Sequence, residues 1–247
     1  MKQILIKLRL QMFIMLTVKD TNNLFKKFLP ENSDEINEML YQYYVLIETE
    51  NQKYNLTGFH NEKLILEGII ESILVFKEIN QKVCDLKSKY ILDIGAGAGF
   101  PSLPYYIYTN QNFNLTIYEP LKKRCVFLEL VKQKLNLGNL TIKNIRAEDS
   151  SELEKFNFIT ARAVSELKNL IQISYHLGKL NNCIFCFLKS NNYLKELENS
   201  QKYIKELNLH IKTLEIICNN IKNVIVYYQK EKQTPKDYPR KWSQIIK

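Results

Sequence analysis

Residues 90–101 read YILDIGAGAGFP, an apolar run that leads directly into a turn with three glycines. The segment from Tyr90 to Ile94 has the length and the apolar character of a buried strand, and Gly95 marks its end. Glycines in such a turn tolerate positive φ and let a ligand approach the backbone closely. Because ligands of doubly wound sheets bind at the carboxyl ends of the strands, we expect a ligand at this turn. The alternative is a tight turn with a purely structural role.

The glycines at 95, 97 and 99 have the spacing GxGxG. In the dinucleotide-binding fingerprint, GxGxxG, the third glycine comes one residue later. The earlier third glycine, with Phe100 and Pro101 directly behind it, resembles the loop of class I methyltransferases, which packs beside the amino-acid part of S-adenosylmethionine. The same spacing disfavours an NAD-dependent enzyme.

Two helical stretches precede this turn, and apolar strands alternate with helical stretches after it. The expected further strands are 115–118, 140–145, 158–161, 183–188, 211–217 and 223–228. The expected helices are 31–51, 62–80, 102–109, 122–136, 166–177 and 193–206. The alternation predicts an α/β fold of the Rossmann-like class I methyltransferase kind, with a mostly parallel sheet, helices on both faces and an antiparallel C-terminal hairpin. We expect an N-terminal helical extension over residues 1–88 and an S-adenosylmethionine-binding domain with a basic C-terminal tail over residues 89–247.

Two acidic positions follow the next strands and extend the expected ligand site. Glu119 ends the second strand, 24 residues after Gly95, where a carboxylate can accept hydrogen bonds from both ribose hydroxyls of a nucleoside. The alternative is a solvent-facing glutamate before Pro120. Ala147 and Glu148 follow the third strand, where methyltransferases commonly have a polar or acidic pair against the adenine. By itself, this acidic segment could equally be a helix N-terminus, where acids are favoured.

Composition limits the remaining function classes. The formal net charge is +9, which is compatible with a polyanionic partner and equally with a lysine-rich genome. Five cysteines without regular spacing indicate a reducing compartment, so we expect a cytoplasmic protein. Cys183 and Cys186 lie three residues apart in an expected strand, on opposite faces, and are interpreted as two core thiols. The three histidines have no metal-ligand spacing, so we expect no metal, and His176 is interpreted as a helix-surface residue.

The N-terminal stretch MKQILIKLRLQMFIMLTVKD is the one segment with a targeting ambiguity. Its apolar part carries Lys7 and Arg9 and is too short to span a bilayer. No cleavage site of small residues follows it, so a signal peptide fits poorly. An amphipathic helix or an upstream translation-start artefact fits better, and we expect no membrane association.

Six segments together resemble the bacterial 16S ribosomal RNA guanine-N7 methyltransferase family, also called the glucose-inhibited division protein B family. They are YNLTGF (54–59), ILDIGAGAGFPSLP (91–104), LKKRCVFL (121–128), IRAED (145–149), ITARAV (159–164) and TPKDYPRK (234–241). The fifth and sixth are the more specific, because generic methyltransferases lack them. The resemblance implies methylation of N7 of a guanine in the 530 loop, with 16S ribosomal RNA or the small ribosomal subunit particle as partner. We expect a monomer.

The resemblance also assigns roles to residues. It implies that Gly95 and Phe100 contact the cofactor S-adenosyl-L-methionine, that Gly97 and Gly99 shape the loop, and that Glu119 holds the ribose. Ala147 and Glu148 would line the adenine pocket. Arg162 would lie at the mouth of the active site as the candidate catalytic residue.

The chain departs from the family pattern at two places. Ser102 stands where the family usually has a second glycine after the loop proline. Glu67 and Gly68 stand where the family usually has an Arg-His pair, ahead of the acidic-serine pair Glu71-Ser72. The missing basic pair weakens the case for an RNA or active-site role of the helix over residues 62–80.

The implied chemistry needs few catalytic groups. Guanine N7 is a lone-pair nucleophile, so the enzyme has to align N7, carbon and sulfur and exclude water. Pyrimidine C5 methylation needs a cysteine nucleophile, and no cysteine stands at a strand end in a matching motif. Arg162 could bond the guanine O6/N7 edge, a phosphate or the cofactor carboxylate. The alternative is an arginine that satisfies backbone carbonyls.

Contact with RNA is expected from two basic groups. They are Lys122, Lys123 and Arg124 after Glu119, and Lys236, Arg240 and Lys241 in the tail. Tyr238 and Trp242 in the tail could add base stacking, although composition alone favours a solvated, frayed terminus. The remaining alternatives are a methyltransferase for another RNA, a protein or a small molecule, and a non-catalytic RNA-binding protein.

Overall fold

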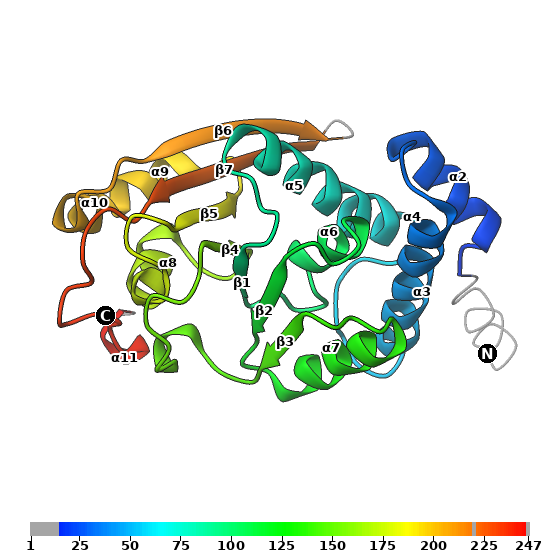
Figure 1. Cartoon of the computed structure of the whole chain (residues 1–247), viewed down its shortest axis with the longest axis horizontal. Helices are drawn as coiled ribbons and strands as arrows, with labels where there is room; N and C mark the ends of the chain where they lie inside the picture. The colour runs from blue at the N-terminus through cyan, green and yellow to red at the C-terminus, as the bar shows by residue number, and fades with distance from the viewer. Residues whose placement is uncertain (1–14, 219–220, 246–247) are drawn as a thin grey trace, which may run out of the picture.

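The computed structural model describes residues 15–218 and 221–245 of the chain. Within these ranges seven strands form one sheet in the order β3-β2-β1-β4-β5-β7-β6 (Figure 1). The first five strands of that row, from β3 through β2, β1 and β4 to β5, run parallel. Strand β7 pairs antiparallel with both β5 and β6. The strands are β1 (Tyr90–Ile94), β2 (Asn114–Tyr118), β3 (Leu140–Lys143), β4 (Phe158–Arg162), β5 (Ile184–Lys189), β6 (Lys212–Cys218) and β7 (Ile221–Gln229). The predicted mostly parallel sheet with its antiparallel hairpin is confirmed.

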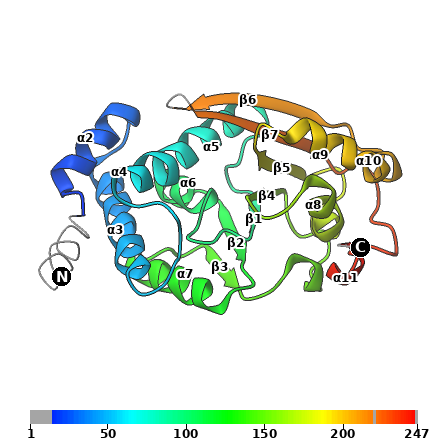
Figure 2. The same ribbon diagram turned by 180° about the vertical axis from the view of Figure 1, so that it is seen from behind.

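Helices cover both faces of this sheet (Figures 1 and 2). Those whose buried residues belong to the first hydrophobic cluster are α2 (Val18–Phe28), α3 (Asp34–Asn51), the π-helical turn η1 (Leu64–Ile70), α5 (Glu71–Lys82), α6 (Ser102–Tyr108) and α7 (Lys122–Lys134). Those that contribute to the second cluster are α8 (Leu167–Ser174), η3 (Tyr175–Leu177), α10 (Gln201–Leu207) and α11 (Trp242–Ile245). The helical turn α4 (Asn61–Lys63) precedes η1, η2 (Ala147–Asp149) follows β3, and α9 (Tyr193–Asn199) precedes α10.

The two hydrophobic clusters follow from the alternation of side chains along the strands. On β1, Ile91 belongs to the first cluster and its neighbour Leu92 to the second. Successive side chains of a strand point to opposite faces, so a sheet covered on both sides buries both sets. Cys183 and Cys186 divide in the same way, one in each cluster, which confirms two core thiols.

The N-terminal helices share the first cluster with the sheet. Tyr43, Tyr44 and Ile47 of α3 are fully buried in the same cluster as Ile91 of β1. The hydrophobic contacts therefore cross the expected boundary between residues 88 and 89. That boundary stays a prediction.

The strand order places the site. The chain runs from β1 outward through β2 to β3, and then returns to place β4 on the other side of β1. The connections of β1 and β4 therefore leave the sheet in opposite directions, and a crevice opens at their carboxyl ends. The glycine turn follows β1 directly, and Arg162 is the last residue of β4.

Several local boundaries differ from the sequence prediction. The helix expected over 193–206 is two helices, α9 and α10, which meet at the buried Ser200. The hydroxyl of Ser200 donates to the carbonyl of Glu196 at 2.6 Å, and such back-bonding bends helices. The helix expected over 62–80 contains the π-helical turn η1, a feature that hydrophobic periodicity does not reveal.

The chain ends are described as far as residues 15 and 245. Residues 1–14, which hold most of the expected N-terminal amphipathic helix, lie outside the described residues.

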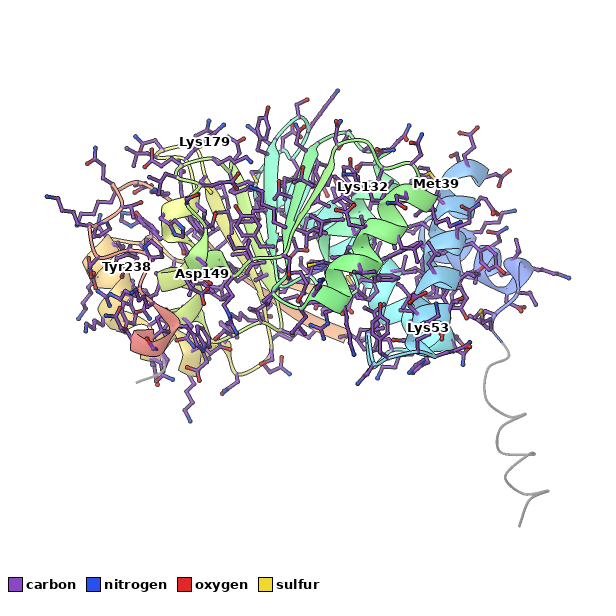
Figure 3. The ribbon with its side chains drawn as sticks, turned by 90° about the horizontal axis from the view of Figure 1, so that it is seen from below. Met39, Lys53, Lys132, Asp149, Lys179 and Tyr238 are labelled. Carbon is purple, nitrogen blue, oxygen red and sulfur yellow. The ribbon has the colours of Figure 1, made fainter. Side chains whose placement is uncertain are left out.

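Seen from below (Figure 3), Asp149 and Tyr238 lie on one side of the sheet, and Lys132 and Met39 lie on the other. Among the described residues, the helices include none with the length and apolar character needed to span a bilayer.

Candidate active site

The glycine turn has the open backbone that its sequence predicts. Gly95, Gly97 and Gly99 all have positive φ, between +61° and +109°. A Cβ atom on Gly99 would lie 2.7 Å from both the Leu103 side chain and the Tyr43 hydroxyl. A Cβ atom on Gly97 would meet nothing closer than Arg124, at 3.8 Å. The middle glycine therefore faces free space in which a ligand can approach the backbone.

Three buried hydrogen bonds hold the turn from behind. The Tyr43 hydroxyl of α3 donates to the carbonyl of Ala98 at 2.5 Å. The Asp93 carboxylate, at the end of β1, accepts from the hydroxyl and the backbone N–H of Ser102 at 2.6 and 3.2 Å. Burial raises the pKa of Asp93 to about 7, and its bonds to Ser102 oppose that rise. Ser102, the departure from the family pattern, therefore anchors the start of α6.

Glu119 is buried at the carboxyl end of β2 and is bonded to the glycine turn. Its Oε2 accepts from the Gly97 N–H at 3.0 Å, and its Oε1 accepts from the Leu121 N–H at 2.9 Å. The Arg124 guanidinium is 3.9 Å from Oε2. The alternative of a solvent-facing glutamate is wrong, because the residue is 1% exposed. The carboxylate is thus held in one place beside the turn.

Ala147 and Glu148 lie in the short turn η2, which follows β3. Ala147 is buried, and among the described residues Glu148 Oε1 is buried and has no hydrogen-bond partner. The nearest cation, Arg146, is 3.7 Å from this oxygen. Burial raises the pKa of Glu148. A buried acceptor without a partner is costly, so this oxygen is suited to a donor group of a bound ligand.

Arg162 lies at the mouth of the crevice, largely buried. Its guanidinium carbon is 5.2 Å from the centre of the Phe100 ring, so the last residue of β4 contacts the glycine turn. Its Nη1 is 3.4 Å from the Ser72 hydroxyl and 4.0 Å from Glu71 Oε2. The guanidinium contacts that the structure describes are therefore to side chains, and not to backbone carbonyls.

The structure adds residues that the sequence did not point to. Glu71 and Ser72 on α5 contact Arg162, and Asn223 on β7 donates to Glu71 Oε1 at 2.7 Å. The helix over residues 62–80 lines the candidate cleft through Glu67 and Glu71, although the family's basic pair is missing from it. The pair Glu71-Ser72 was visible in the sequence, but contact with Asn223, 152 positions away, has no local signal.

These residues line a cleft of about 490 Å³. The glycine turn from Gly95 to Ala98 forms one wall, Glu67 and Glu71 form another, and Arg162 and Asn223 lie between them. A second cleft of about 500 Å³ shares Arg162 and Asn223 with the first and continues over the ends of β4 and β5. Neither Glu119 nor Ala147 lines either cleft. Both lie on the side of the glycine turn away from Glu71.

The two expected basic groups are not brought together. Lys122 and Lys123 are exposed at the start of α7, which packs in the first cluster, whereas the tail packs in the second. Arg240 bonds to Glu206 and Asp237 at 3.0 and 2.8 Å.

The tail is docked on the domain as far as residue 245. Tyr238 is buried, and Trp242 lies 5.8 Å from the Arg146 guanidinium. The alternative of a frayed terminus is therefore wrong for the described residues, and Tyr238 is not free to stack on a base. Lys236 and Lys241 are exposed.

The sequence predicted His176 on a helix surface, and this prediction is wrong. The residue is buried in η3. Burial lowers its pKa to about 4, so the imidazole is neutral at pH 7. Its chain neighbours Tyr175 and Leu177 belong to the second cluster. Among the described residues no group of histidine, cysteine, aspartate and glutamate side chains could hold a metal ion.

Solved structures share the fold of this chain. An S-adenosylmethionine-dependent methyltransferase of Aquifex aeolicus covers 64% of this chain and 90% of its own, with a TM-score of 0.50 at 12% identity. A Methanococcus maripaludis protein described as an S-adenosyl-L-methionine-dependent methyltransferase covers 78% of this chain and 94% of its own, with a TM-score of 0.54 at 12% identity. The fold is that of the class I S-adenosylmethionine-dependent methyltransferases.

Sequence relatives define the family. Residues 36–230 match the family model GidB, described as rRNA small subunit methyltransferase G. A protein of Mycoplasmopsis pulmonis named ribosomal RNA small subunit methyltransferase G is 39% identical over 231 residues, 91% of this chain and 98% of its own. A protein of Clostridium botulinum with the same name is 35% identical, over 88% of this chain and 92% of its own. The chain belongs to this family and is an S-adenosylmethionine-dependent methyltransferase, as its resemblance predicted.

Proposed function

We propose that this methyltransferase modifies N7 of a guanine in the 530 loop of 16S ribosomal RNA, as naked RNA or in the small ribosomal subunit particle. The observation that carries the proposal is the single cleft in which the glycine turn meets Arg162. A cofactor against the turn and a base against the arginine would face each other in this cleft. We further propose that the enzyme acts as a monomer in the cytoplasm, where its free cysteines would stay reduced.

The residues around the turn fit the cofactor in three ways. Gly97 offers open backbone for the amino-acid part, and the fixed Glu119 carboxylate offers acceptors for the ribose hydroxyls. Glu148 Oε1 and the buried Ala147 suit the adenine and its amino group. Gly95 and Phe100 also line the cleft and would contact the cofactor, and Gly99 would fix the shape of the loop. When bound, S-adenosylmethionine supplies an activated sulfonium methyl group.

The side chains of the cleft suit a nucleophile that needs no deprotonation. The described lining includes no cysteine and no histidine, so covalent catalysis through a thiol has no candidate there. Alignment and exclusion of water are the contributions left to the chain. Arg162 would donate to the base, and Lys122, Lys123, Arg124, Lys236, Arg240 and Lys241 would supply phosphate contacts from the two faces of the domain.

The test uses labelled S-adenosylmethionine and small-subunit RNA from cells that lack the enzyme, both as naked RNA and as particles. The labelled base is then mapped by cleavage chemistry selective for N7-methylguanine. Label at one guanine of the 530 loop is the expected result. Label elsewhere, or none while the cofactor still binds, would assign the enzyme to a different acceptor.

A further inference from the structure

Three polar side chains from distant parts of the chain meet in the cleft beyond the glycine turn. Glu71 comes from α5, Arg162 from the end of β4 and Asn223 from β7. Asn223 Nδ2 donates to Glu71 Oε1 at 2.7 Å, which fixes the carboxylate. Arg162 Nη1 lies 4.0 Å from the other oxygen, Oε2. An acceptor and a donor group therefore stand side by side and face the same space.

This arrangement leaves much of its hydrogen-bonding capacity unused. A carboxylate has about four acceptor sites and a guanidinium has five N–H donors. In the described part of the chain, Glu71 accepts only the bond from Asn223, and Arg162 makes only the long 3.4 Å bond to Ser72. The separation of 4.0 Å is too long for a direct hydrogen bond between the two groups. Buried polar groups with free capacity in a cleft indicate a polar ligand.

The pair is complementary to one edge of one RNA base. Guanine presents the acceptor O6, the donor N1–H and the donor 2-amino group in a row along its Watson–Crick edge. Adenine, cytosine and uracil present no two adjacent donors there. RNA-modifying enzymes read an extruded base through this edge, because it is free once the base leaves its pair. A carboxylate beside a guanidinium matches the guanine row.

We propose that Glu71, held by Asn223, accepts hydrogen bonds from N1–H and the 2-amino group of the target guanine, while Arg162 donates to O6. This inference rests on the proposed function. These hydrogen bonds involve N1–H, the 2-amino group and O6 of the guanine. None of them uses N7, which therefore stays free to attack the methyl group. It makes Glu71 the residue that distinguishes guanine from the other bases.

Glu67 provides a matched control. It lines the same cleft one turn before Glu71 and carries the same charge, but its Oε2 lies 3.6 Å from the Lys63 ammonium and its side chain is 33% exposed. A purely electrostatic effect of the cleft would change equally in Glu67→Gln and Glu71→Gln. Recognition of the base edge would change only in Glu71→Gln, because the new amide nitrogen faces two donors.

The experiment compares small-subunit RNA that carries guanine or hypoxanthine, which lacks the 2-amino group, at the methylated position. Single-turnover methyl transfer is measured for the wild type, Glu71→Gln and Glu67→Gln. The wild type and Glu67→Gln are expected to prefer guanine by roughly 10-fold or more, the discrimination of a good bidentate contact. In Glu71→Gln the preference falls to the baseline set by the intrinsic reactivities of the two bases.

The outcomes separate this inference from the proposed function. A wild type that methylates no guanine N7 would contradict the proposed function. A wild type that does so, together with a Glu71→Gln variant that keeps the full preference, would overturn the role of Glu71 alone. If Glu71→Gln transfers no methyl group, its affinities for the two RNAs are compared. Equal affinities support the contact, and a retained preference overturns it.

Discussion

The two halves of the cleft are built differently. On the cofactor side, the turn from Gly95 to Phe100 is fixed by short bonds to Glu119, Tyr43 and the backbone itself. On the side where we propose that the base binds, Glu71 and Arg162 stand 4.0 Å apart with most of their bonding capacity unused. A small, constant ligand is suited to a fixed site, whereas a base that has to be drawn from an RNA structure is suited to groups that complete their bonds on its arrival.

The largest expected effect is the loss of cofactor affinity when the space at Gly97 is filled. Gly97→Val places a β-branched side chain at φ +61° and into the ligand space. We expect the affinity for S-adenosylmethionine to fall roughly 100-fold, about 3 kcal/mol, in a chain that remains folded. Calorimetric titration measures the affinity, and Gly138→Val, at an exposed turn where a Cβ atom would meet only Gln111 Oε1 at 3.9 Å, is the control. Undiminished cofactor binding would show that the turn is not the cofactor site.

Arg162→Lys tests whether the arginine belongs to the base side. Lysine keeps the charge but loses the planar fork, so contacts to the base are weakened. We expect methyl transfer to fall roughly 30-fold, about 2 kcal/mol, while cofactor affinity stays within a few-fold of the wild type. Single-turnover rates and cofactor titration give the two numbers. An equal loss of cofactor affinity would move Arg162 to the cofactor half.

Tyr43→Phe tests how much rigidity the cofactor side takes from the N-terminal helices. The variant removes the hydroxyl that bonds the Ala98 carbonyl and leaves that buried acceptor without its donor. We expect the free energy of unfolding to fall by about 1–2 kcal/mol, with a smaller loss of cofactor affinity. Denaturant unfolding measures it. Tyr41→Phe, at a half-buried position of the same helix, should change little, and equal effects of the two variants would remove Tyr43 from the loop support.

The smallest expected effect concerns Asp93. Its pKa is raised from 3.8 to about 7 by burial, so the folded state holds the proton more tightly than the unfolded state. Stability from this group is therefore complete below the unfolded pKa and is lost as the pH rises toward 7. Between pH 6 and 7 the wild type should lose roughly 1 kcal/mol relative to Asp93→Asn. Parallel pH profiles of the two proteins in thermal unfolding would contradict the raised pKa.

The cofactor half was predictable because its parts are local in sequence. The strand, the three glycines and the first acid lie within 30 residues, and the strand period and the GxGxG spacing are read directly from the chain. The base half was only partly predictable. Arg162 follows from its motif, but its neighbours Glu71 and Asn223 are brought together by the crossing of α5 over the antiparallel hairpin, which no local pattern specifies.

Burial was the other property that the sequence did not reveal. His176 was expected on a helix surface and Tyr238 in an RNA-contacting tail, yet both are buried. Tertiary contacts also explain the docked tail. Arg240 is held by Glu206 and lies over the Tyr203 ring, in helix α10.

The position of β7 has a consequence for the synthesis of the chain. The last strand to emerge from the ribosome is inserted between β5 and β6, and is not added at the edge. Until residue 229 has emerged, β5 has an unpaired edge and the cleft lacks Asn223. A nascent or truncated chain that ends before β7 could still form the glycine turn, but it would lack the group that fixes Glu71. If Glu71 has the proposed role, the enzyme would gain its means to read a base only once β7 has been synthesised.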